Sequence, residues 1–184
     1  MSLSAERVVA EAGDLADQGS LSLAALAQRL GVKVPSLYKH VGGLEDLHRR
    51  LALAGAADLT AALGDATVGR SGRDALRACA VAYRGYAKKH PGRYAAIQRA
   101  PDPADTELSA AGERLVRLLY SVLRGYGLDE DGTVHATRAV RSALHGFVTL
   151  EAAGGFGLQY DAEESYDRLV DLLDAGFTAG AVSR

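Results

Sequence analysis

Cysteine is almost absent from the 184-residue sequence, and long apolar runs are absent altogether. The single cysteine, Cys79, cannot form a disulfide within the chain and agrees with a reducing compartment. No apolar run approaches the roughly 20 residues that span a bilayer, and the N-terminus lacks the character of a signal peptide. We therefore expect a soluble cytoplasmic protein with no membrane partner.

A large excess of charge of one sign is also lacking. The 21 basic and 23 acidic residues leave a formal net charge of -2, so overall charge does not by itself indicate a nucleic-acid partner. Residues 1–50 carry six basic and six acidic groups, residues 51–100 eight and three, and residues 101–184 seven and fourteen. Positive charge therefore lies in the first half of the chain, whereas the second half would repel phosphate.

Patterns typical of catalytic and metal sites are missing as well. The sequence has no Ser-His-acid motif, no phosphate-binding loop and no carboxylate pair marked by its spacing. His135 and His145 are ten residues apart, which places them on different faces of one helix, and Cys79 has no neighbouring partner. We therefore expect no enzymatic activity, no cofactor and no metal site.

Helical periodicity is what the sequence does contain. Apolar residues recur at helical spacing in about nine segments, and neither strand-like alternation nor an internal repeat is present, so we predict an all-α fold. In the first helix the apolar residues form an inner face, and the carboxylates Glu11, Asp14 and Asp17 are expected outside. The predicted helices cover residues 4–18, 23–30, 34–41, 43–63, 74–90, 93–99, 104–126, 129–153 and 162–180.

The second and third predicted helices are joined by a tight turn. Ser22 is a candidate N-cap, and Gly31 follows the last apolar position of its helix, where a left-handed residue normally ends a helix. Pro35 is tolerated only in the first turn of the next helix, which therefore begins at about Val34. Residues 28–40 include three basic residues and no acidic one, so this surface is basic although the protein is not.

This stretch resembles the DNA-binding region of the TetR family of transcriptional regulators. The family pattern is an apolar helix, Gly-Val, and a short helix ending in Leu-Tyr-x-His followed by Phe or Val. The matching residues are Leu26, Ala27, Gly31, Val32, Leu37, Tyr38, His40, Val41, Glu45 and Leu47. The resemblance implies a three-helix DNA-binding domain in residues 1–50, a ligand-binding and dimerisation domain in residues 51–184, and a connecting helix over residues 43–63. Leu44 departs from the family, which often has a phosphate-contacting lysine there.

The resemblance also assigns roles to residues around the turn. The N-terminal part of the helix predicted over residues 34–41 lies deepest in the major groove, so base contacts are expected there. Hydroxyl, ammonium and imidazole groups further along are expected to bind phosphate. An ordinary helical hairpin would instead leave these side chains on the surface without a role. The candidate DNA-binding residues are Ser22, Lys33, Val34, Pro35, Ser36, Tyr38, Lys39 and His40.

A second stretch, His145 to Glu151 followed by Gly-Gly-Phe-Gly, resembles the C-terminal region of one TetR subgroup. In the family the last two long helices pair with their copies as a four-helix bundle, and other C-terminal helices enclose a ligand cavity. Each aromatic residue taken alone is better explained as core, and His145 as a hydrogen-bonded core histidine is an equal alternative. The candidate ligand-binding residues are Tyr83, Tyr86, Ile97, Tyr120, His145, Phe147 and Phe156.

The leading hypothesis is a ligand-responsive, DNA-binding transcriptional regulator. It would act as a repressor that binds a palindromic operator in double-stranded DNA as a homodimer and is released by a small-molecule effector. The alternative is a helical protein-interaction module of the same fold that has lost DNA binding, which Leu44 and the weak overall charge leave open. A ligand-processing helical enzyme is a third hypothesis.

Overall fold

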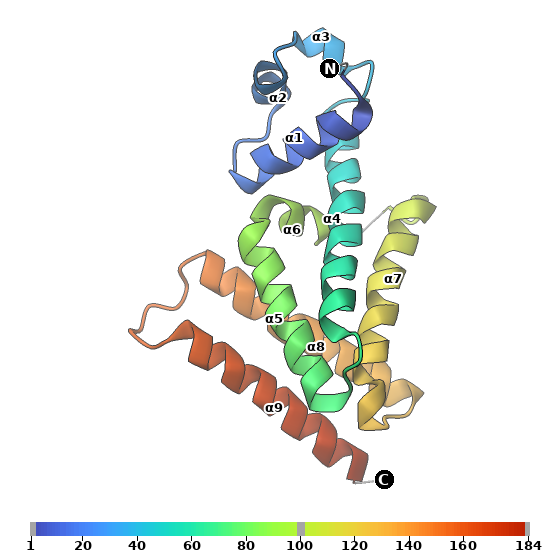
Figure 1. Ribbon diagram of the computed structural model, residues 1–184, viewed down its shortest axis with the longest axis vertical. Helices are drawn as coiled ribbons and strands as arrows, with labels where there is room; N and C mark the ends of the chain where they lie inside the picture. The colour runs from blue at the N-terminus through green and yellow to red at the C-terminus, as the bar shows by residue number, and fades with distance from the viewer. Residues whose placement is uncertain (1–2, 99–101, 183–184) are drawn as a thin grey trace. The chain divides into compact units, whose positions relative to one another are not determined.

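The computed structural model describes residues 3–98 and 102–182, and all regular structure in these ranges is helical (Figure 1). This confirms the predicted all-α fold. The elements in order are α1 (Ala5–Asp17), α2 (Leu23–Leu30), α3 (Val34–Leu37), α4 (Leu44–Thr67), α5 (Gly72–Lys89), α6 (Pro91–Ile97), α7 (Thr106–Leu123), the 3-10 helix η1 (Arg124–Tyr126), α8 (Glu130–Ala152) and α9 (Ala162–Val182).

The chain forms two compact units. Unit 1 comprises residues 1–58 and 89–113, and unit 2 comprises residues 59–88 and 114–184. Helices α4 and α7 each contribute residues to both units, since residues 58 and 113 lie inside them. The functional division after residue 50 remains a prediction, because the compactness of the chain does not test where its activities are divided.

Unit 1 is built around a core contributed by its first four helices. The apolar faces predicted for α1 and α2 meet there, because each amphipathic helix must cover its apolar stripe to stabilise the fold. Burying one such leucine or valine side chain stabilises by about 1.5–3 kcal/mol. The core residues, all at most 6% exposed, are Val8, Ala12, Leu15, Leu26, Ala27, Leu37, Val41, Leu47 and Leu51.

Several helix boundaries differ from the sequence prediction by two or more residues, and those of α4 and α6 are examples. Helix α4 continues past residue 63 to Thr67, and the Val68 N–H donates a 3.1 Å hydrogen bond to the Gly64 carbonyl, so Gly64 does not end the helix. Helix α6 begins at Pro91, earlier than the predicted start at residue 93. Proline is well suited to a first helical position because it has no N–H to leave unsatisfied. The predicted end of this helix at residue 99 lies outside the described residues.

Unit 2 packs α5, α8 and α9 through buried aromatic and aliphatic side chains. Tyr166 of α9 is 2% exposed, and its hydroxyl donates a 2.7 Å hydrogen bond to the Ala80 carbonyl of α5. Tyr126 likewise donates to Asp174 at 2.6 Å, and its ring meets Phe177 edge to face. These bonds satisfy hydroxyl groups that would otherwise be costly to bury.

Candidate nucleic-acid interface

The turn between α2 and α3 has the local geometry that the sequence predicts. The Ser22 hydroxyl oxygen accepts a 3.1 Å hydrogen bond from the Ala25 N–H, which caps α2. Gly31 adopts the left-handed conformation with φ 67°, and the Val32 N–H donates to the Ala27 carbonyl at 2.9 Å. These bonds satisfy groups that the end of a helix leaves free, so the path between the two helices is fixed.

Helix α3 is shorter than the predicted helix over residues 34–41. Its regular part spans Val34–Leu37, although the N–H groups of His40 and Val41 still donate to the Leu37 carbonyl at 2.8 and 3.0 Å. A helix this short is not stable by itself, and it is held by packing. Leu37 and Val41 are 0% and 2% exposed in the core of unit 1, so they fix the face that α3 turns outward.

None of the predicted DNA-contacting residues is one of the buried core residues, although Val34 packs against that core. Tyr38 is 57% exposed, Lys33, Pro35, Lys39 and Ser22 are also exposed, and the remaining three are half-buried. Among the residues that the structure describes, Lys33, Tyr38 and Lys39 have no ion-pair or hydrogen-bond partner for their side chains. Their cationic and hydroxyl groups are therefore available to an external acceptor. Whether that acceptor is DNA remains a prediction.

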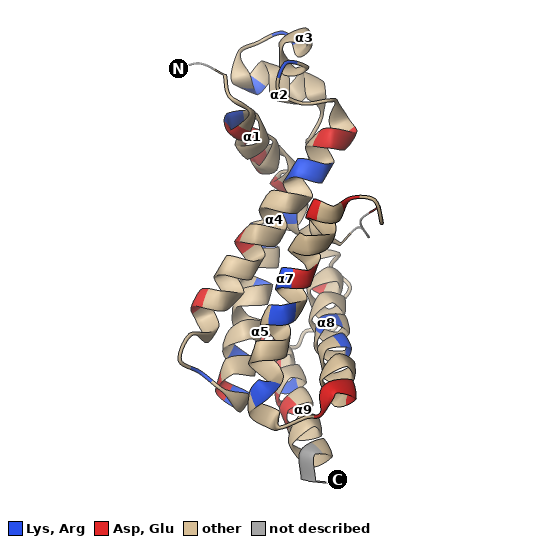
Figure 2. Cartoon of the chain, turned by 90° about the vertical axis from the view of Figure 1, so that its right-hand side faces the viewer, with Lys and Arg blue, Asp and Glu red and all other residues tan. Residues whose placement is uncertain are grey.

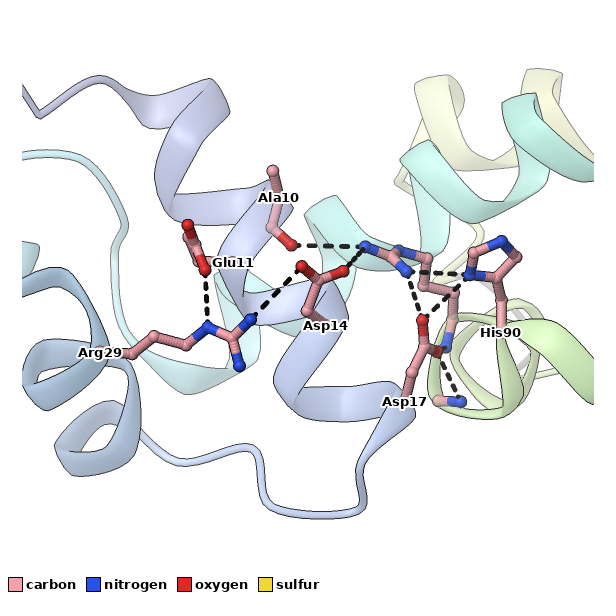
Figure 3. Close-up of polar contacts among 8 residues, drawn as sticks. Ala10, Glu11, Asp14, Asp17, Arg29 and His90 are labelled. Atoms are coloured by element: carbon pink, nitrogen blue, oxygen red, sulfur yellow. Dashed lines mark hydrogen bonds and ion pairs between the residues drawn. The ribbon is translucent and has the colours of Figure 1, made fainter.

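No carboxylate interrupts this surface, because residues 18–44 contain no acidic residue (Figure 2). Arg29, which the sequence assigns to the basic surface, is engaged elsewhere: its Nε lies 2.6 Å from Glu11 Oε2 and its Nη2 lies 3.5 Å from Asp14 Oδ2 (Figure 3). The unpaired positive charge of the turn is therefore reduced to Lys33 and Lys39. In return, Arg29 ties α2 to α1.

Asp46, in the first turn of α4, binds the backbone of the loop that connects α3 to α4. Its Oδ2 accepts a 2.8 Å hydrogen bond from the Gly42 N–H and lies 2.9 Å from Arg50 Nε. The Gly42 N–H, assisted by Arg50, lowers the pKa of Asp46 below its ordinary value. Leu44, which stands where the family often has lysine, is 39% exposed at the start of α4.

The predicted ligand-contacting residues are divided between the units. Ile97 lies on α6 in unit 1, where a Cβ atom built on Gly55 of α4 would come within 3.2 Å of its side chain. Exposure in the unit 2 set ranges from 6% for Tyr83 to 43% for Phe156. The members in unit 2 are Tyr83, Tyr86, Tyr120, His145, Phe147 and Phe156.

Two of the unit 2 residues come together directly. The rings of Phe147 and Phe156 are 4.8 Å apart, and Phe147 is also 4.8 Å from the ring of Tyr166. His145 Nδ1 lies 3.5 Å from the hydroxyl of Thr149 one turn along α8. The structure provides a packing role for Phe147, and the ligand-binding role of all seven residues remains a prediction.

Arg84 was not among the predicted site residues, and it is only 7% exposed in unit 2. Its Nε and Nη2 donate to the two carboxylate oxygens of Glu151 at 2.9 and 2.6 Å, and its Nη1 donates to Glu163 at 2.8 Å. The guanidinium lies 5.0 Å from the ring centroid of Tyr166. Because Arg84 donates to Glu151, it lowers the pKa of that carboxyl below its ordinary value. A signal was available, since position 84 falls on the apolar face of the predicted helix.

A cleft of about 1220 Å³ opens within unit 1, and none of the predicted ligand-contacting residues lines it. It is bordered by the end of α1 and by α4, α6 and the first residues of α7. Within the described residues no group of three or more metal-binding side chains comes together. None of the helices described here is both long and apolar enough to cross a membrane.

Two helices joined by a tight turn, the second of which (α3) carries no acidic residue, are typical of DNA-binding helix-turn-helix regulators. Comparison with known proteins agrees with this class. The family described as "Tetracyclin repressor-like, C-terminal domain" matches residues 76–173. The uncharacterized HTH-type transcriptional regulator Rv0681 of Mycobacterium tuberculosis is 42% identical over 158 residues, which cover 85% of this chain and 72% of that protein. The chain therefore belongs to the TetR family of transcriptional regulators.

Solved structures agree on the fold. The transcriptional regulator SCO7222, a TetR from Streptomyces coelicolor, superposes with a TM-score of 0.71 at 24% identity over 97% of this chain and 99% of that one. A TetR variant from Acinetobacter baumannii in complex with minocycline gives 0.67 at 21% identity over 98% and 99%. At these identities the likeness concerns the fold alone.

Proposed function

We propose that the protein binds a palindromic operator in double-stranded DNA as a homodimer and represses transcription in the cytoplasm until a small-molecule effector releases it. One observation carries this proposal: Lys33, Tyr38 and Lys39 are exposed and unpaired on a turn that contains no carboxylate. A surface without a DNA-binding role would have little reason to exclude acidic residues over residues 18–44. Membership of the TetR family, a family of regulators, supports the same conclusion.

In this proposal residues 1–50 read DNA and residues 51–184 bind the effector and a second copy. Base edges are read by Lys33, Val34, Pro35 and Ser36, and phosphates are bound by Tyr38, Lys39 and His40. Ser22 uses its oxygen to cap α2, and its hydroxyl proton remains available for a phosphate.

We expect Lys39→Ala to weaken binding to all duplexes alike, whereas Val34→Ala and Ser36→Ala change sequence preference. Each homodimer loses two lysines, so the decrease of log affinity with log salt should become less steep by about 2. The measurement is fluorescence anisotropy, at several salt concentrations, with the duplex that the wild type selects from a random library. If changing Val34 and Ser36 leaves the selected sequence unaltered, the assignment of base contacts is wrong. If the wild type selects no duplex, the proposed function fails.

The proposed dimer uses the outer faces of α8 and α9. Leu172 on α9 is 71% exposed, and both helices also carry exposed small residues without charge, which allow close helix packing. The exposed small residues are Ala139 and Ser142 on α8 and Ala175, Gly176 and Ala179 on α9.

We expect Leu172→Glu to weaken dimerisation by about 100-fold or more, because a twofold interface brings both introduced charges to the same dry surface. Sedimentation equilibrium measures this directly. The matched control is Val81→Glu on α5, which alters an apolar residue that is 56% exposed on another helix of unit 2. Equal dimer affinities for the two variants would contradict the proposed interface.

The proposed effector site lies inside unit 2. The hydroxyl oxygen of Thr137 on α8 is buried and has no hydrogen-bond partner among the described residues. Buried polar groups are nearly always paired, so this hydroxyl suits a ligand that brings a donor or acceptor. Tyr83, Tyr86 and Phe147 would supply the apolar walls. The minocycline complex of the A. baumannii relative supports a small-molecule effector as a class.

A further inference from the structure

The cleft in unit 1 has a volume of about 1220 Å³, and the described residues that line it all belong to that unit. Pockets for small molecules usually measure about 300–1,000 Å³, so the cleft has room for one. In the proposed function unit 1 carries the DNA-reading head, formed by α1 to α3, and the effector site lies in unit 2. Neither role uses the cleft, so a molecule bound in it would occupy a second, separate site.

Part of the cleft wall is apolar. Leu51 and Ala52 come from the buried face of α4, where they are 1% and 6% exposed, and Ala95 and Ala96 come from α6. Leu108 of α7 adds to the same wall. Binding becomes more favourable when an apolar surface displaces water from such side chains. A ligand of the cleft therefore needs an apolar body.

The polar part of the wall is mainly acidic. Carboxylates come from the first turn of α4, from the start of α7 and from the segment before α7 (Figure 2). Among the described residues of the wall, Arg49 is the only lysine or arginine, so negative charge predominates. DNA is thereby excluded as the occupant, because these carboxylates repel phosphate. The acidic wall residues are Glu45, Asp46, Asp102, Asp105 and Glu107.

Arg49 leaves much of this negative charge uncompensated. It donates to Asp105 from Nε and Nη2 at 2.5 and 2.8 Å, and from Nη2 to Glu107 at 2.9 Å. The hydrogen bond from Arg49 lowers the pKa of Asp105 below its ordinary value, so this carboxylate is ionised at neutral pH. Glu45 has no such partner among the described residues, and Asp102 accepts one backbone hydrogen bond at 2.9 Å. Both side chains are exposed, so they can pair with a cation from outside.

We propose that the cleft is a second ligand site and binds an amphiphilic organic cation. The cationic group lies against the carboxylates of Glu45 and Asp102, and the apolar body of the molecule covers Ala52 and Ala95. An organic anion would be repelled by the same carboxylates, and an uncharged molecule would gain only the apolar contacts. The site is independent of the effector site in unit 2 and of DNA binding.

Titration of the full-length protein with benzyltrimethylammonium tests this site, with the backbone amide shifts in NMR spectra as the readout. The cation should shift the amides of Ala52 and Ala95. Its dissociation constant should be lower by about tenfold or more than that of phenylmethanesulfonate, which has the same benzyl body and a negative charge. No shift at these amides, or an equal affinity for the anion, would overturn the proposal. Shifts confined to unit 2 would overturn it as well, because the cation would then bind elsewhere.

Two variants locate the cationic and the apolar half of the site. Replacing both exposed carboxylates, by Glu45→Gln together with Asp102→Asn, should weaken cation binding by about fivefold or more. Glu130→Gln, which removes an exposed carboxylate of α8 in unit 2, should leave it unchanged. Ala95→Trp places a large ring in the cleft and should weaken binding by about tenfold or more. All these positions are exposed, so the variants should fold, and the midpoint of urea unfolding verifies this.

Unchanged cation affinity in the double variant or in Ala95→Trp would contradict the proposed site. These measurements involve neither DNA nor the effector of unit 2. Failure of the cation to bind would therefore leave the proposed function standing, and failure of the wild type to select a duplex would leave the cation site standing.

Discussion

Replacing Gly92 with alanine is expected to destabilise unit 1 by about 3 kcal/mol or more. The added Cβ atom would overlap the backbone carbonyl of Ala16, and backbone atoms cannot rotate away as the end of a side chain can. Helix α6 would have to move off α1, which would break the hydrogen bonds from Gly92 and Arg93 to Asp17. The midpoint of urea unfolding, followed by far-ultraviolet circular dichroism, measures the loss.

The matched control for Gly92 is Gly112, a helical glycine of unit 1 in α7 with open space around its Cβ position. Gly112→Ala should stabilise by about 0.5–1 kcal/mol, because alanine has the higher helix propensity and meets no neighbour. The opposite signs of the two substitutions isolate the contact with α1. An unfolding midpoint for Gly92→Ala at or above that of the wild type would show that α6 does not pack against α1 this closely.

Arg84→Met should destabilise unit 2 by about 3 kcal/mol or more. Methionine fills much of the same space, but it leaves the carboxylate of Glu151, 18% exposed, without the guanidinium that binds both of its oxygens. Lys88 at 3.3 Å compensates only in part. The contact between Arg84 and the ring of Tyr166 is lost as well. Chemical unfolding at neutral pH measures the effect.

Acid should reduce the difference between the wild type and Arg84→Met. The folded-state pKa of Glu151 lies below its unfolded value, so its pairing stabilises the wild type fully above the unfolded pKa and is lost as pH falls through the folded pKa. In the variant, a protonated Glu151 also no longer carries a half-buried charge that only Lys88 compensates. Unfolding measured from about pH 6 down to about pH 3 should therefore show the two proteins converging.

Two further variants make the test of Arg84 specific. Arg168→Met removes an arginine that is 75% exposed and pairs with Glu164 one turn away, so it should change stability by less than about 1 kcal/mol. Combining Arg84→Met with Glu151→Gln should recover part of the loss, because glutamine carries no charge that needs the guanidinium. If the double variant lost more free energy of unfolding than the two single variants lose together, this account would be contradicted.

The sequence by itself predicted the features that depend on neighbouring residues. Helical periodicity identified the all-α fold, and Ser22, Gly31 and Pro35 marked the ends of α2 and α3, because caps and turns are formed by residues a few positions apart. The TetR resemblance followed from the same local pattern. Helix ends such as Thr67 were predicted less well, because a glycine inside a helix, such as Gly64, costs only about 1 kcal/mol and does not by itself end the helix.

Only the tertiary structure decided which charged groups meet. Asp17 appeared to belong to a solvated helix face, yet it binds backbone groups 75 positions along the chain, and Arg84 binds a carboxylate 67 positions away. The partners of a charge depend on how helices pack, and no periodicity encodes that packing. Likewise, the close approach of Gly92 to Ala16 requires two backbones to meet in space. The reading head is thus recognisable from sequence, whereas its attachment to α6 is a property of the folded chain.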